Sequence, residues 1–314
     1  MRSNTLRTLR LISTITAITR IKLMDFFNAL LNPNLSFLRY ALLAGVLSSV
    51  AFGIVGSYVV TRQITSIAGA IAHCVLAGIG FSLYAQYNWG WAWCDPTLGA
   101  FASALISAGI LGLISRYGHE REDTLIGALW AVGMAIGLVF LAKTPAYVDP
   151  MMYLFGNILL CSERDVWMVI GLDVIVLGIT IALYQPLLAV CFDEQFARLR
   201  GVPVRLLYTL LLALTALTVV LLIRVVGIVM VIALLTLPAA IAGQCSKRLW
   251  QMMAWAAGLS ALFVAMGLMF SYEHNLPSGP IIILVAGIVY LIVMTALTLF
   301  KRYRRREAMQ RVAT

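Results

Sequence analysis

The sequence predicts an all-α, polytopic transmembrane helical bundle, and two observations carry this prediction: the composition and the lengths of the apolar runs. Of its 314 residues, 62% are hydrophobic and 11% are charged, whereas about 25% of a soluble domain is charged. A core of this size cannot hide so many apolar side chains, so most of them face lipid. A spanning helix needs about 20 apolar residues. Runs near this length cover residues 38–61, 64–88, 96–115, 124–142, 166–190, 207–223, 225–243, 249–271 and 280–300.

The runs divide the chain into a basic N-terminal tail over residues 1–24, a transmembrane domain over 25–300 and a basic, cytoplasmic C-terminal tail over 301–314. The N-terminal tail is not a signal peptide, because no A-x-A-like cleavage site follows it. A shorter apolar run, Met151 to Cys161, is too short to cross a hydrocarbon core of about 30 Å at about 1.5 Å per residue. It is predicted to be a re-entrant or interfacial helix.

The net charge of +10 reports membrane orientation and not nucleic-acid binding, because the basic residues lie at the ends of the runs and in the tails. Alternate loops are rich in arginine and lysine, which predicts that they are cytoplasmic. The opposite loops include the tryptophans of residues 89–93, which are interpreted as an interfacial belt. Nine spans place the basic N-terminus outside. Eight spans, with a half-span beside Arg224, place it inside, and both counts stay open.

Missing motifs exclude several functions. The sequence holds no GxxxxGK[ST] phosphate loop, so this chain cannot hydrolyse ATP by a P-loop and is not expected to be an enzyme or to bind a cofactor. Of thirteen acidic residues only Asp173 falls within a predicted span, which argues against an ion-driven carrier. Asp173 is interpreted as a partner for a polar group near the interface. Three histidines on three segments argue against a membrane enzyme.

Residues 193–204, DEQFARLRGVPV, are predicted to form a short helix in the longest cytoplasmic loop. Acidic residues at its start, Asp193 and Glu194, and Arg198 in its last turn suit the helix dipole, and Gly201 is placed to end it. Its apolar edge consists of Phe196 and Leu199. This edge either lies on the bilayer or docks onto a soluble partner, and the spacing favours neither.

His73 lies on a helix face of small residues, with Gly69 one turn before it and Ala77 and Gly80 after it. Such strips let helices pack closely. We expect the strip to leave the imidazole exposed in a gap, and an ionisable group at membrane depth indicates a functional site. His73 is then either a hydrogen-bonded packing residue or a metal contact.

Pro238 lies inside the apolar run that follows Gly227. A proline there frees the carbonyl of Leu234 and clashes with the preceding turn, so the helix is predicted to bend. The bend is either a gate or a static kink.

Five segments together resemble the permease subunits of bacterial metal-uptake ABC transporters, which import zinc, manganese or iron. These segments are DEQFARLRGVPV, VVGIVMVIALLTLPAAIA (225–242), YLFGNILL (153–160), REDTLIGALWAVGMAIG (121–137) and NLPSGPIIILVAG (275–287). The resemblance covers residues 24–300. It implies that the helix around Phe196 is a coupling helix that sits in a cleft of a cytoplasmic ATPase.

The resemblance further implies a multi-pass protein of the bacterial inner membrane with three kinds of protein partner. They are separate cytoplasmic ATPase subunits, which bind the ATP, an extracytoplasmic metal-binding protein and a second permease subunit. The cargo that it implies is a divalent metal ion.

Two residues depart from the family pattern. The family has an aspartate four residues before the histidine, where this chain has Gly69, and usually an aspartate where Asn275 stands. Either other ligands replace them, with Asp149, Glu273 and His274 as the nearest candidates, or the cargo is a metal chelate such as a siderophore or cobalamin. Glu273 and His274 also fit a solvated loop face.

Overall fold

A computed structural model of the protein describes residues 36–114, 122–145, 149–156 and 158–313, so the predicted N-terminal tail lies outside the described residues. The described part is helical throughout, as predicted. The helices are α2 (Ser36–Thr61), α3 (Thr65–Trp89), α4 (Pro96–Ile114), α5 (Glu122–Lys143), α6 (Pro150–Phe155), η3 (Ile158–Leu160), α7 (Glu163–Ala182), α8 (Tyr184–Phe192), α9 (Glu194–Leu199), α10 (Val204–Val226), α11 (Ile228–Cys245), α12 (Leu249–His274) and α13 (Ser278–Ala313).

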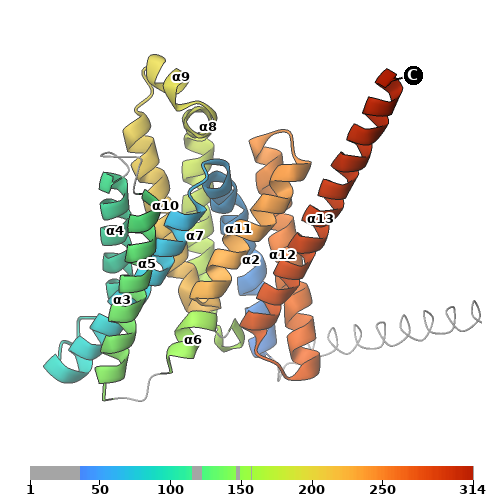
Figure 1. Ribbon diagram of the computed structural model, residues 1–314. Coiled ribbons are helices and arrows are strands. Elements are labelled where there is room, and N and C mark those ends of the chain that lie inside the picture. The colour runs from blue at the N-terminus through green and yellow to red at the C-terminus, as the bar shows by residue number, and fades with distance from the viewer. Residues whose placement is uncertain (1–35, 115–121, 146–148, 157, 314) are drawn as a thin grey trace, which may run out of the picture.

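Within the described residues, nine helices are long and apolar enough to span a membrane: α2 to α5, α7 and α10 to α13. The count of nine is supported over eight, because α10 and α11 both qualify by length and composition and only Gly227 separates them. The two ends of the bundle are called the α9 end and the α6 end (Figure 1). Helix α2 begins at the α6 end and α13 finishes at the α9 end, so the described chain starts and stops on opposite sides.

The predicted run over residues 166–190 is wrong as a single span. Helix α7 ends at Ala182 and a separate helix, α8, follows from Tyr184. Pro186 explains the break, because a proline ring clashes with the carbonyl four residues earlier and donates no hydrogen bond to it. The chain therefore turns at Leu183, which caps both helices.

Helices α2 and α3 are the most buried spans, and α13 is the least buried. Helix α3 packs between α4 and α5, which form one side of the molecule in Figure 1. Helix α2 packs against α7, α11 and α12, and α10 contacts both groups. The helices that carry the candidate site, α3 and α9, thus lie in the interior of the bundle and at one of its ends.

Glycines let α2 approach its neighbours closely. A Cβ atom at Gly56 would clash with the carbonyl oxygen of Leu235 in α11, and one at Gly53 would lie 2.6 Å from the Cβ of Ala257 in α12. Lipid offers no hydrophobic drive for helix association, so such backbone contacts supply much of the packing energy. The small residues of α2 are therefore needed for its central place.

The short run Met151 to Cys161 forms α6 and η3, which confirms that it does not span. Asp149 begins α6, since its carboxylate accepts a hydrogen bond from the Met151 N–H at 2.9 Å. The other end of α6 presses Gly156 against Gly227, and both glycines have positive φ angles, 65° and 82°. Helix α6 is thus seated on the junction between α10 and α11.

Asp173 does not lie near an interface as predicted but in the middle of α7, where it is buried. Its Oδ1 has no hydrogen-bond partner among the described residues. The predicted pairing with a nearby polar group is thus not made by this oxygen, and for the carboxylate as a whole it stays a prediction.

The substitution Gly56→Ala should destabilise the protein, because the new Cβ would force α2 and α11 apart. Overpacking of this kind typically costs about 1–3 kcal/mol. Gly258→Ala in α12 is the matched control, since a Cβ there meets nothing within 4 Å. Thermal unfolding of both purified variants in detergent measures the difference, and equal melting temperatures would contradict the close contact.

Candidate functional site

Helix α9 matches the short helix predicted around Phe196. Its N-cap is Asp193, whose Oδ1 accepts a hydrogen bond from the Phe196 N–H at 2.8 Å. Gly201 follows the helix with a φ of 74°, a conformation that glycine adopts without strain. The predicted start and stop residues therefore act as the sequence indicates.

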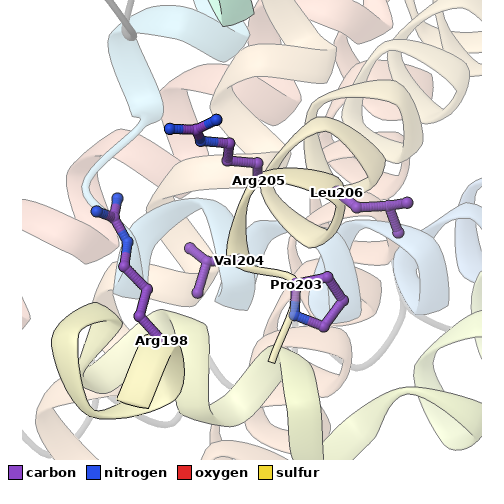
Figure 2. Close-up of a pocket in the computed structure, with 5 residues that line it drawn as sticks. All are labelled: Arg198, Pro203, Val204, Arg205 and Leu206. Carbon is purple, nitrogen blue, oxygen red and sulfur yellow. The ribbon is translucent and has the colours of Figure 1, made fainter. Parts of the chain in front are cut away.

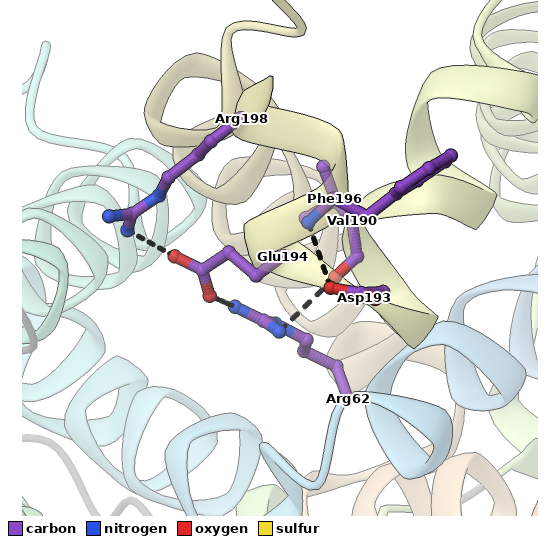
Figure 3. Close-up of polar contacts among 6 residues, drawn as sticks. All are labelled: Arg62, Val190, Asp193, Glu194, Phe196 and Arg198. Carbon is purple, nitrogen blue, oxygen red and sulfur yellow. Dashed lines mark hydrogen bonds and ion pairs between the residues drawn. The ribbon is translucent and has the colours of Figure 1, made fainter. Parts of the chain in front are cut away.

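A three-residue ionic network holds α9 against the bundle (Figure 3). The carboxylate of Glu194 bonds Arg62 through one oxygen and Arg198 through the other. Arg62 belongs to the turn between α2 and α3, and its Nη1 also donates to the carbonyl of Val190 at 3.2 Å. The hydrogen bond from Arg62 is the largest cause that holds the pKa of Glu194 below its ordinary value, and Arg198 adds to it while burial opposes it.

The predicted apolar edge of α9 is open to the surroundings. Leu199 is 87% exposed and Phe196 is 48% exposed, while Ala197 between them is fully buried against the bundle. The Arg200 guanidinium lies 4.7 Å from the centre of the Phe196 ring. In Figure 3 this ring points away from the Arg62–Glu194 pair. Helix α9 thus offers two large side chains outward.

A basic pocket adjoins α9 where the chain enters α10. Arg198, Pro203, Val204, Arg205 and Leu206 line it. Figure 2 shows the two arginine side chains extending to the same side, with Pro203 and Leu206 away from them. Arg205 was not among the predicted site residues, although it directly follows the segment 193–204 that was predicted to form the short helix.

His73 lies on α3, and the expectation that its imidazole is exposed in a gap is wrong. The side chain is buried, and the indole of Trp130 from α5 covers it with ring centroids 4.3 Å apart. Nδ1 of His73 lies 3.0 Å from the carbonyl oxygen of Gly69. If Nδ1 carries the proton and donates this bond, the Nε2 lone pair is left to accept a ligand.

Trp130 also fills the space beside Gly69. A Cβ at Gly69 would lie 3.2 Å from Cζ3 of Trp130, which is tighter than ordinary van der Waals contact. Sequence reasoning missed Trp130, although a signal existed: Trp130, Gly133 and Gly137 repeat at helical spacing on α5. Position 69, where the family resemblance predicts an aspartate, is therefore next to an aromatic ring in this chain.

The other predicted pathway residues lie at the α6 end. Asp149 caps α6, and Glu273 and His274 are the last residues of α12. His274 is exposed, and its Nδ1 lies 3.1 Å from the carbonyl oxygen of Phe270. Asn275 has a φ of 52° and ends α12 in the left-handed conformation, which asparagine tolerates better than most residues.

The structure does not bring these residues together with His73. Sixteen positions separate His73 from Trp89 at the α6 end of α3, which corresponds to about 24 Å along a helix. Within the described residues, no group of three or more His, Cys, Asp or Glu side chains could hold a metal ion. Among the described residues, His73 therefore has no second such side chain grouped with it that would complete a metal site.

Pro238 is buried within α11, and the helix continues through it from Ile228 to Cys245. The predicted bend and its use as a gate stay predictions.

The described residues form a helical bundle with nine apolar helices that are long enough to span a membrane, which defines a polytopic membrane protein. The chain belongs to the ABC 3 transport family, whose family model matches residues 34–297.

Relatives of the chain are similar over most of their length. An uncharacterized membrane protein, slr2045 of Synechocystis sp., is 44% identical over 82% of this chain and 89% of its own. The manganese import system permease protein ScaB of Streptococcus parasanguinis is 31% identical over 82% of this chain and 89% of its own. The solved structure of PsaBC from Streptococcus pneumoniae in complex with Fab superposes with a TM-score of 0.76 at 28% identity, over 86% of this chain and 95% of that chain. With the nine apolar helices, these relatives indicate a multi-pass bacterial membrane protein.

Removing the α9 cap by Asp193→Ala should loosen α9, because the Phe196 N–H loses its acceptor. A lost N-cap costs about 1 kcal/mol, so amide hydrogen exchange in residues 194–199 should rise roughly fivefold. Asp193→Asn keeps an acceptor oxygen and serves as the control. Equal exchange in the two variants would contradict the capping role.

Proposed function

We propose that this chain is the permease subunit of an ABC importer for a divalent metal ion, and that α9 docks onto a cytoplasmic ATPase. The exposed edge of α9 is the observation that carries this proposal. The sequence holds no P-loop, so an importer built on this chain must take its energy from a partner. The relative named as a manganese import permease supports a metal cargo and makes manganese the first ion to test.

The shape of α9 favours a protein partner over the bilayer. Its two exposed side chains, Phe196 and Leu199, project from a helix that ion pairs hold in place. Aromatic and aliphatic anchors of this kind are typical of helix-in-groove recognition. Helix α9 also stands beyond the end of α4 in Figure 1. Such a rigid, projecting apolar edge suits a cleft in a soluble ATPase.

The charge distribution supports placing the α9 end in the cytoplasm. Arg62, Arg198, Arg200 and Arg205 gather there, together with Lys247 and Arg248 in the loop between α11 and α12. Cytoplasmic ends carry such an excess of basic residues. The tryptophans of residues 89–93 and the short helix α6 then face outward, where an exported metal-binding protein would deliver the cargo. Asp149, Glu273, His274 and Asn275 are the candidate contacts on that side.

His73 is proposed as a contact for the metal on its path through the bundle. Donation from its Nδ1 to the Gly69 carbonyl, 3.0 Å away, would fix the neutral tautomer with Nε2 free. Metal-binding histidines commonly donate their other ring N–H to a backbone carbonyl in this way. A path also needs weak contacts, because an ion held too tightly does not leave. A single imidazole without a carboxylate meets that requirement.

We further propose that a second permease subunit completes the complex, so that two permease chains form a dimer.

The substitution Phe196→Ala should weaken ATPase association by about 1–3 kcal/mol if this ring is a central anchor. The measurement is the amount of ATPase that co-purifies with the folded permease. Phe37→Ala is the control, since Phe37 is 38% exposed but lies at the α6 end. Wild-type co-purification with Phe196→Ala would refute the docking proposal.

The cargo proposal is tested at His73. Uptake of manganese, zinc and iron into proteoliposomes, normalised to folded protein, should fall at least tenfold in His73→Ala. If all three ions enter at the wild-type rate, His73 is a packing residue. Loss of siderophore uptake instead would favour a metal chelate as the cargo.

Restoring the family's carboxylate gives a separate prediction. Gly69→Asp alone should destabilise the protein, because the new Cβ meets the Trp130 ring at 3.2 Å. The double variant Gly69→Asp with Trp130→Leu makes room, and a carboxylate one turn from His73 should then tighten manganese binding. Calorimetry compares this variant with Trp130→Leu alone. Equal affinities would show that positions 69 and 73 do not share an ion.

A further inference from the structure

Arg62 joins α9 to the helix that carries His73. We propose that Arg62 is a positioning residue that transmits movement of α9 to the turn between α2 and α3. This inference rests on the proposed function, because it assumes that an ATPase moves α9. It names the side chain by which that movement reaches the transport path.

The guanidinium group of Arg62 contacts three helices: α9 and its two neighbours along the chain, α8 and α10. Its Nη2 pairs with Glu194 of α9, and its Nη1 donates to the carbonyl of Val190 in α8 at 3.2 Å. The guanidinium carbon lies 5.7 Å from the centre of the Tyr208 ring in α10. Only an arginine presents a planar fork that meets two acceptors and stacks on a ring at once. Figure 3 shows the fork between Glu194 and Val190.

The backbone at Arg62 is held tightly to α2. The Arg62 N–H donates to the carbonyl of Tyr58 at 2.9 Å, and the Ile64 N–H donates to that of Val59 at 3.0 Å. Helix α3 starts at Thr65, after Gln63 with a φ of 59°. Only three residues separate α2 from α3, so the connection is too short to absorb a displacement of Arg62. Such a displacement would therefore also move the start of α3.

The other covalent and ionic connections of α9 do not reach the turn between α2 and α3. Along the chain it continues into α8 on one side and into α10 on the other. Glu194 also pairs with Arg198, but that pair stays within α9. Of the ion pairs that α9 makes with described residues, only the one with Arg62 reaches the α2–α3 turn. His73 lies eleven residues beyond Arg62 and about two turns along α3, which begins at Thr65.

The test uses the full complex of permease, ATPase and exported binding protein in proteoliposomes, with manganese(II) as the probe. Manganese uptake and phosphate release are measured together, and their ratio gives the ions moved per ATP hydrolysed. In Arg62→Gln the ATPase should co-purify at the wild-type level while this ratio falls at least fivefold. Glu194→Gln should show the same loss. It keeps the contacts of Arg62 with Val190 and Tyr208 and therefore decides the matter if Arg62→Gln does not fold.

The double variant adds a readout that a merely structural role would not give. If Arg62 and Glu194 act through one contact, the double variant should couple no worse than the poorer single variant. Arg248→Gln is the control. It removes a positive charge at the same end, from an exposed residue that makes no ion pair with the described residues. Its ratio should stay within twofold of the wild type.

Three results would overturn the inference. A ratio within twofold of the wild type in Arg62→Gln would show that movement travels another way. Loss of the ATPase from that variant would show that Arg62 only holds the docking helix in shape. A double variant worse than both singles would show that the two residues act separately. Failure of the docking proposal is recognised independently, by normal ATPase association in Phe196→Ala.

Discussion

The close approach of helix backbones is the constraint on which the rest of this structure depends. Inside a membrane, helices gain little by hiding apolar side chains from lipid, so they associate where small residues let their backbones touch. Gly53 and Gly56 provide such contacts for α2, and Gly78 and Gly80 provide them for α3 against α4 and α5. The two most buried spans are therefore those with the least side chain at their contact points.

This constraint also determines what kind of site α3 can offer. Its face of small residues leaves room for few side chains, and Trp130 takes the space beside Gly69. The imidazole of His73 lies under that indole, in contact with a ring and a backbone carbonyl. Burying a carboxylate there would require a compensating cation whenever no metal is present. Glycine and tryptophan avoid that requirement. Under the proposed function they leave a passing ion only the weaker contact of one imidazole.

Much of the fold could be predicted from sequence, because long apolar runs and end signals are local properties. The nine spans, the short α6 segment and the bounds of α9 follow from them. Features set by contacts between distant segments could not be predicted: the cover of Trp130 over His73 and the seat of Gly156 on Gly227. The break at Leu183 was a local feature that the apolar run concealed, because Pro186 lies within it.

The rigid packing of α2 affects how a movement of α9, driven by the proposed ATPase, could reach the proposed metal path beside His73. The contacts of Gly53 and Gly56, in the last third of α2, fix it against α12 and α11. Interiors packed this closely do not stretch or compress to absorb a displacement. A pull on Arg62 at the end of α2 is therefore met by a rigid helix on one side and by α3 on the other. Helix α3 has its own glycine contacts with α4 and α5, so it would tend to move with them as one group. If α9 moves as proposed, the α2–α3 turn is the point where that displacement would enter the group of α3, α4 and α5, and α10, which contacts both groups, would have to accommodate it.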